Sequence, residues 1–90
     1  MKPGEIQFQP VVGTARYNIL HGVHMTWQGG EGVYPDVVGY VERRKTPRRK
    51  QIGKPAPEFY WIVNLERGDG RTFYDEAEAL AWARAVVAMS

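Results

Sequence analysis

The fold is decided by the stretch Phe59-Tyr60-Trp61-Ile62-Val63-Asn64-Leu65-Glu66 and the residues that follow it. A Gly68-Asp69-Gly70 turn leads into Arg71-Thr72-Phe73-Tyr74, and an alanine-rich segment runs on from Asp75. β-branched and aromatic runs on either side of a glycine turn are typical of a strand hairpin. The predicted order is therefore strand, turn, strand, helix.

Side-chain alternation assigns the two faces of this hairpin. One face of the first strand carries Phe59, Trp61, Val63 and Leu65, and the other carries Tyr60, Ile62, Asn64 and Glu66. A three-residue turn at 68–70 would place Leu65 opposite Phe73 and Arg67 opposite Arg71. In that register Phe73 joins the Trp61 face and Tyr74 joins the Tyr60 face.

The last segment begins with a helix start signal. Asp75 can cap the first turn, and Glu78 stands three residues on, at capping-box spacing. A helical period gathers apolar residues on one side: Ala79, Leu80, Ala83, Val86 and Val87. We expect one C-terminal helix at about 75–89, packed on the Trp61 face of the sheet.

The earlier part of the chain reads as strands. Glu5 to Gln9 alternates polar and apolar residues and predicts a short edge strand that ends at Pro10. Residues 15–28 have the same period, and Gly22 predicts a turn or a bulge within them. Gly29 to Gly32 predicts a flexible turn.

Val33 to Arg44 is the next predicted strand, and Pro35-Asp36 is expected to mark its start. Together these segments predict an α+β fold: an antiparallel sheet of about four or five strands with one C-terminal helix packed on one face.

Bulk composition limits the class of protein. Ninety residues form a single domain, 1–90, with one modest core. The 43% hydrophobic content indicates a globular chain, and the absence of cysteine excludes disulfides and thiolate metal sites. No apolar run is long enough to cross a membrane. We expect a soluble cytoplasmic protein that has no membrane partner.

Positive charge is concentrated in one segment. Seven basic residues and no acidic ones lie in it: Arg43, Arg44, Lys45, Arg48, Arg49, Lys50 and Lys54. The remaining five basic and ten acidic residues give the rest of the chain a formal charge of −5. Prolines at 47, 55 and 57 and the lack of periodicity predict a flexible basic loop at about 43–57. It is either a binding surface for an anionic partner or a solvated loop.

Residues for catalysis or metal binding are sparse. No Ser/His/acid set and no carboxylate pair in an apolar setting occurs. His21 and His24 are the only histidines, and three apart in a strand they point to opposite faces. Two such ligands without cysteine do not make a zinc site. We expect no enzyme activity, no metal and no small-molecule cofactor.

The sheet face opposite the helix is the second candidate surface. Tyr60, Ile62 and Tyr74 are expected there, with Tyr40 on the neighbouring strand. Tyrosines on an open sheet can stack on bases or form a protein interface. Residues 1–28 carry several large apolar side chains, so we expect them to fold over part of this face.

One third of the chain resembles a known family. The runs that carry the resemblance are Trp61-Ile62-Val63, Gly68-Asp69-Gly70, Thr72-Phe73, Glu76-Ala77-Glu78-Ala79 and Trp82-Ala83. They resemble the strand–strand–helix of the arm-type DNA-binding domains of phage integrases. The resemblance implies a three-stranded sheet that enters the DNA major groove. In this resemblance Tyr60, Arg67 and Arg71 are the matching outward or turn positions, and the family implies a small phage or mobile-element protein. The cations here cluster before the central strand, which departs from that family.

Two functional hypotheses follow. The first is a non-catalytic nucleic-acid-binding module that uses the basic residues of 43–54, with Tyr60 and Tyr74. The second is a phage-encoded inhibitor of anti-defence (anti-CRISPR) type, or an adaptor, that docks on an acidic or nucleic-acid-binding surface of a host complex and blocks it by occupancy. The oligomeric state is left open.

Overall fold

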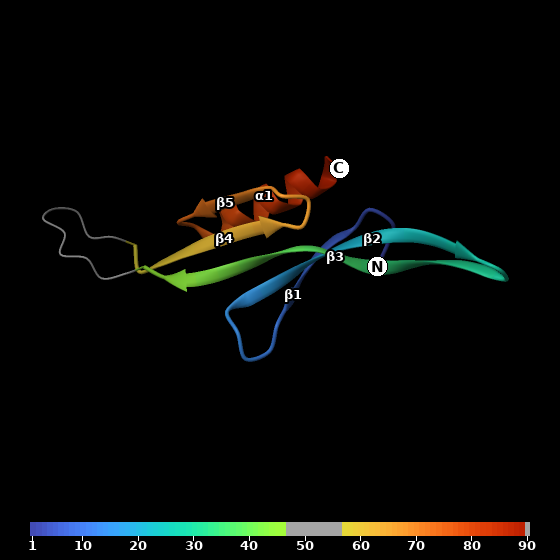
Figure 1. Cartoon of the computed structure of the whole chain (residues 1–90), viewed down its shortest axis with the longest axis horizontal. Coiled ribbons are helices and arrows are strands. Elements are labelled where there is room, and N and C mark those ends of the chain that lie inside the picture. Colours follow the sequence, from blue (N-terminus) through green and yellow to red (C-terminus); the bar gives the residue numbers. More distant parts are fainter. Residues whose placement is uncertain (47–56, 90) are drawn as a thin grey trace, which may run out of the picture.

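A computed structural model describes residues 1–46 and 57–89. Five strands form one antiparallel sheet in chain order, and one helix packs on one face of it (Figure 1). The elements are β1 (Ile6–Pro10), β2 (Arg16–Trp27), β3 (Gly30–Lys45), β4 (Phe59–Leu65), β5 (Gly70–Phe73) and α1 (Glu76–Ala88). The predicted α+β fold with one C-terminal helix is confirmed.

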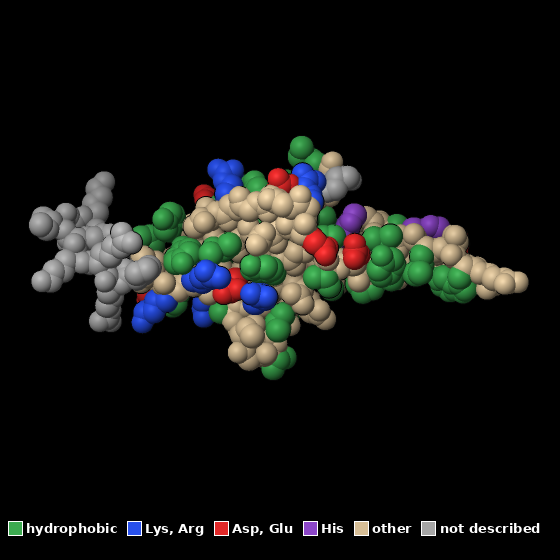
Figure 2. Space-filling model, in the orientation of Figure 1, with side chains coloured by type: hydrophobic (Ala, Val, Ile, Leu, Met, Phe, Trp, Pro, Cys, Tyr) green, Lys and Arg blue, Asp and Glu red, His purple; other side chains and the backbone are tan. Residues whose placement is uncertain are grey.

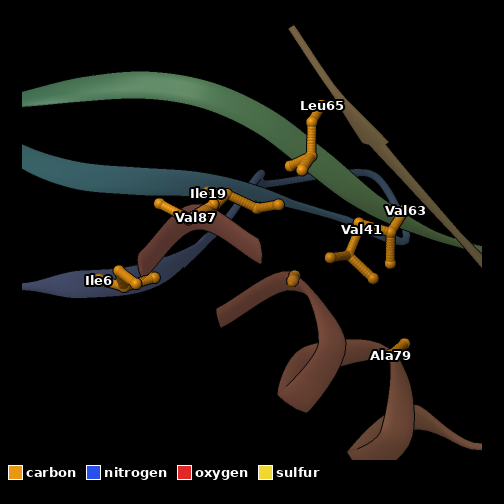
Figure 3. Packing of buried hydrophobic residues seen from close by; sticks show 8 residues of the cluster. Ile6, Ile19, Val41, Val63, Leu65, Ala79 and Val87 are labelled. Carbon is orange, nitrogen blue, oxygen red and sulfur yellow. The ribbon is translucent and has the colours of Figure 1, made fainter. Parts of the chain in front are cut away.

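The core lies between α1 and the middle of the sheet. Ile19, Val41 and Val63 are fully buried, and Val41 pairs directly with Val63 across β3 and β4. Figure 3 shows these strand side chains gathered next to the helix that carries Ala79 and Val87. Burying an aliphatic side chain of this size contributes about 1.5–3 kcal/mol. The core therefore rests on three central strands and one helix.

Helix α1 begins where the sequence predicts. The Asp75 side chain accepts a hydrogen bond of 3.3 Å from the Glu78 backbone N–H, which satisfies one of the free donors of the first turn. Ala79 and Ala83 are fully buried, so the helix approaches the sheet closely at these two small residues. Beside them the rings of Phe73 and Trp82 lie 5.7 Å apart between centroids.

The β4–β5 hairpin has a different register from the predicted one. Phe73 pairs with Trp61 rather than with Leu65, and Arg71 pairs with Val63. The Leu65 N–H donates to the Asp69 carbonyl at 2.7 Å, so the turn comprises residues 66–68. Gly68, whose φ is +106°, supplies the left-handed conformation at the end of this turn. Because the shift is an even number of residues, Phe73 keeps its place on the Trp61 face.

Strand β2 continues without a turn, and strand β3 is longer than predicted. No turn occurs at Gly22, and the irregularity in the pairing of β2 with β3 lies between Ile19 and Leu20, before the expected position. Gly22 lies where the N-terminal segment crosses the strand: a Cβ on it would stand 2.3 Å from the Lys2 carbonyl oxygen. β3 starts at Gly30 rather than near Pro35, and the two strands form a hairpin that extends beyond the helix (Figure 1).

The N-terminal residues do not cover the sheet face opposite α1, contrary to our expectation. β1 and β2 instead add two strands to the edge of the sheet, in the order β1-β2-β3. Their large side chains Ile6, Phe8 and Ile19 contribute to the core beneath α1. Pairing of β2 with β3, and of β1 with β2, therefore places these two strands beside the central strands and not on top of them.

Candidate nucleic-acid interface

The described cations of the basic segment lie at the end of β3. Arg43, Arg44 and Lys45 are the last three residues of that strand, so the predicted loop starts later than residue 43. All three are exposed. The other basic residues, Arg48, Arg49, Lys50 and Lys54, lie outside the described part of the chain.

Strand alternation divides these three cations between the two faces of the sheet. Arg43 pairs with Trp61, and Lys45 pairs with Phe59, in phase with the core pair Val41–Val63. The Arg43 guanidinium carbon lies 4.6 Å from the centre of the Phe59 ring. Arg44 pairs with Tyr60 on the opposite face. Positive charge therefore reaches both faces at this end of the sheet.

We call the sheet face opposite α1 the open face, and it carries three cross-strand rows of side chains. The rows are Asn18–Tyr40–Asn64, Arg16–Glu42–Ile62 and Arg44–Tyr60. No described helix or strand packs on this face. Tyr40, Tyr60 and Ile62 are only half-buried as a result. Aromatic rings and arginines are thus neighbours on one accessible surface.

Glu42 links two arginines of the open face. Its carboxylate accepts hydrogen bonds from Arg16, at 2.7 Å from Nη2 and 3.3 Å from Nε, and from Arg44 Nε at 3.2 Å. The hydrogen bond from Arg16 is the main reason that the pKa of Glu42 lies below its ordinary value. The hydrogen bond to Glu42 likewise raises the pKa of Arg44, with a smaller contribution from the Tyr60 hydroxyl. The three charges leave a net positive charge on this part of the face.

Tyr40 is held in place from two sides. The Arg16 guanidinium carbon lies over its ring, 4.0 Å from the centroid. Asn64 Nδ2 donates a hydrogen bond of 3.3 Å to its hydroxyl oxygen. Around these residues the surface is hollowed to a volume of about 540 Å³, and Asn18, Glu66 and Gly68 also line the hollow. The open face therefore has both a basic end and a concave centre.

The two tyrosines of the predicted site differ in position. Tyr60 lies on the open face beside Arg44. Tyr74 follows the last residue of β5 and pairs with no residue of β4. Its side chain is 65% exposed. The prediction had missed Arg16, Asn18 and Glu42. Alternation in 16–20 predicted a strand, but only the β2–β3 register brings Arg16 beside Glu42.

The histidines lie on β2 at a distance from the basic end. His24 Nε2 is 3.3 Å from Glu31 Oε2, across the β2–β3 hairpin. Within residues 1–46 and 57–89, no three His, Asp or Glu side chains are grouped as a metal site would need. In the same residues no helix is long and apolar enough to cross a membrane.

Comparison with known proteins gives no relative for this chain. No family model, no curated protein and no solved structure matches it. The resemblance to integrase arm-type domains stays a prediction that these comparisons do not test.

Proposed function

We propose that this chain is a non-catalytic nucleic-acid-binding protein whose interface joins the basic end of β3 to the open face. The observation that supports it most strongly is the cross-strand pair of Arg44 and Tyr60. This pair places a phosphate-binding cation next to an aromatic ring. Arg43 and Lys45 add two more exposed cations at the same end of the sheet.

The chemistry of this surface suits a polyanion that also has flat bases. Clustered Lys and Arg neutralise phosphates and release counterions, which gives affinity that depends on salt. Aromatic side chains on an accessible groove or sheet stack on bases with little regard to sequence. The four basic residues between 48 and 54 continue the same charge in the sequence. In this proposal they extend the phosphate-binding part of the interface.

The test is removal of charge at the basic end. The triple variant Arg43→Gln/Arg44→Gln/Lys45→Gln is compared with the original protein by fluorescence anisotropy of labelled single-stranded and duplex oligonucleotides. The control variant Gln28→Glu/Ala81→Glu/Ala88→Glu changes the net charge equally at exposed positions elsewhere. We expect at least a tenfold loss for the first variant and a much smaller loss for the second. Equal losses would contradict the proposal.

A second candidate function, a protein-binding inhibitor or adaptor, is supported by the far end of the β2–β3 hairpin. Residues 22–35 include no Lys or Arg, and Figure 2 shows no blue side chain on the projecting end of the molecule. Met25, Trp27 and Tyr34 lie on one side of this hairpin and are 43%, 54% and 41% exposed. Exposed aromatic residues and methionine are enriched at protein interfaces.

Two glycines of the facing strand leave room for the Trp27 ring: Gly30 pairs with Trp27, and Gly32 pairs with Met25. A Cβ on Gly32 would stand 2.9 Å from the indole, and one on Gly30 would stand 3.2 Å from it. A protein partner of a host complex, as for a phage-encoded anti-defence protein, would meet this surface while the basic end occupies an acidic groove. Cross-linking in a nuclease-treated lysate tests this function. A partner that still cross-links to the double variant Met25→Ser/Trp27→Ser would contradict a role for the hairpin.

A further inference from the structure

We propose that the open face holds one unpaired base against the outer side of the Arg16 guanidinium, with the Asn18 and Asn64 amides at the edge of that base. The inference rests on the proposed function and makes it more specific. The ligand class is single-stranded nucleic acid, and the site is the hollow of about 540 Å³ beside Tyr40. A volume in this range is typical of sites for small organic groups.

Arg16 is fixed in place before any ligand arrives. Tyr40 lies beneath its guanidinium at 4.0 Å from the guanidinium carbon, and Glu42 accepts from both Nε and Nη2. Tyr40 below the guanidinium and Glu42 at its edge together restrict the orientation of its plane. The Arg16 side chain is still 41% exposed. A guanidinium plane is a stacking surface for unpaired bases, as aromatic rings are. A fixed plane loses less rotamer entropy on binding.

Charge favours a base over a phosphate at this position. Glu42 accepts two hydrogen bonds from Arg16, at 2.7 and 3.3 Å, but only one from Arg44, at 3.2 Å, so it offsets the charge of the Arg16 guanidinium more than that of Arg44. Its carboxylate would also repel a phosphate placed on Arg16. The exposed cations Arg43 and Lys45 make no ion pair within the described residues. Phosphates therefore belong at the end of β3 and a base at Arg16.

The amides next to Tyr40 supply hydrogen bonds to the edge of a base. Asn18 and Asn64 stand on either side of Tyr40 in one cross-strand row. Asn64 uses one amide N–H on the Tyr40 hydroxyl. Asn18 is half-buried and makes no side-chain hydrogen bond within the described residues. Amide groups both donate and accept, as base edges require.

This geometry would distinguish single-stranded from duplex nucleic acid. In a duplex both faces of each base are covered by its stacked neighbours and its pairing edge is occupied. An unpaired base can turn outward and stack on a protein side chain. Binding at Arg16 is thus available to a single strand and closed to an intact duplex. The basic end of β3 can contact the phosphates of both.

The test compares Arg16→Lys with the original protein on a labelled single strand and on a blunt-ended duplex of the same length, which has no unpaired bases. Lysine keeps the charge and the ion pair but has no flat group to stack. We expect single-strand affinity to fall about 5- to 150-fold, the range for a stacking contact, with duplex affinity within about twofold. Asn18→Ala is a second variant, and it should weaken single-strand binding selectively without removing a described hydrogen bond.

The outcomes separate this inference from the proposed function. If Arg16→Lys and Asn18→Ala each change the affinity for the single strand and for the duplex equally, the base site is overturned, although binding itself persists. Failure of the original protein to bind either oligonucleotide would overturn the proposed function. Quenching of a 2-aminopurine probe in the single strand, lost in Arg16→Lys, would support the base site directly.

Discussion

Arg16 donates a hydrogen bond of 2.7 Å to Glu42 from the neighbouring strand, on the face that α1 leaves open. The two residues are 26 positions apart in the sequence, and antiparallel pairing of β2 with β3 brings them together. This ion pair fixes the arginine that the base site uses. Its consequence for stability can be measured independently of any ligand.

The stability contributed by Glu42 should depend on pH. The pKa of Glu42 is lower in the folded protein than in an unfolded chain, where the pKa of a glutamate is about 4.3. The contribution is therefore present above that value and is lost as the pH falls through the folded pKa. Urea unfolding should show that the original protein is more stable than Glu42→Gln at pH 7 and that this difference in the free energy of unfolding shrinks toward pH 3. When Arg16→Gln is also present, this pH dependence should weaken. A stability difference that stays constant with pH would contradict the lowered pKa of Glu42.

Ile19 should be one of the most sensitive positions in the core, because its side chain is fully buried between β1, β3 and α1. Truncation of Ile19→Ala should lower the free energy of unfolding by about 2–5 kcal/mol, and Ile19→Val by about 0.5–1.5 kcal/mol. Val12→Ala, at a position 98% exposed, is the matched control and should change it by less than about 0.5 kcal/mol. Similar losses at Ile19 and Val12 would refute the core assignment.

Asp75 should stabilise α1 through its cap. Asp75→Ala removes the acceptor for the Glu78 N–H and should lower the free energy of unfolding by about 1 kcal/mol. Asn is also a good capping residue, so Asp75→Asn should retain most of the stability. Thermal unfolding followed by circular dichroism distinguishes the two variants. Equal stability of Asp75→Ala and Asp75→Asn would show that the cap contributes nothing.

The close approach of α1 to the sheet should make Ala83 intolerant of larger residues. Ala83 is fully buried, whereas Ala81 on the same helix is exposed. Ala83→Leu should cost about 1–3 kcal/mol of stability because the added atoms have no space. Ala81→Leu should be within about 0.5 kcal/mol of the original protein. A stable Ala83→Leu variant would mean that the helix lies further from the sheet.

Local signals in the sequence predicted the elements near the C-terminus well. Asp75 and Glu78 marked the helix start, and alternation placed Phe73 on the Trp61 face. The register of that hairpin was wrong because two glycines, at 68 and 70, were both candidates for the turn. Only the backbone shows that Gly68 has the positive φ.

Features that depend on distant contacts could not be predicted. Gly22 looked like a break in the strand, yet its position requires glycine because the Lys2 backbone leaves no room for a side chain there. Residues 1–28 looked like a cover for the open face, but β2 pairs with β3 and β1 pairs with β2, so both strands extend the sheet at its edge. Arg16 carried no local sign of its partner Glu42. The basic segment was visible in composition, and only the strand alternation shows that Arg43 and Arg44 face opposite sides.

The central claim, that the basic end binds phosphates, is tested most directly by the salt dependence of single-strand affinity. Each phosphate neutralised on a single strand contributes a slope of about −0.7 to the plot of log K against log salt. Contacts by the three cations Arg43, Arg44 and Lys45 alone predict a slope of about −2, and further cations make it steeper. A slope near zero, or no binding at about 50 mM salt, would contradict the account.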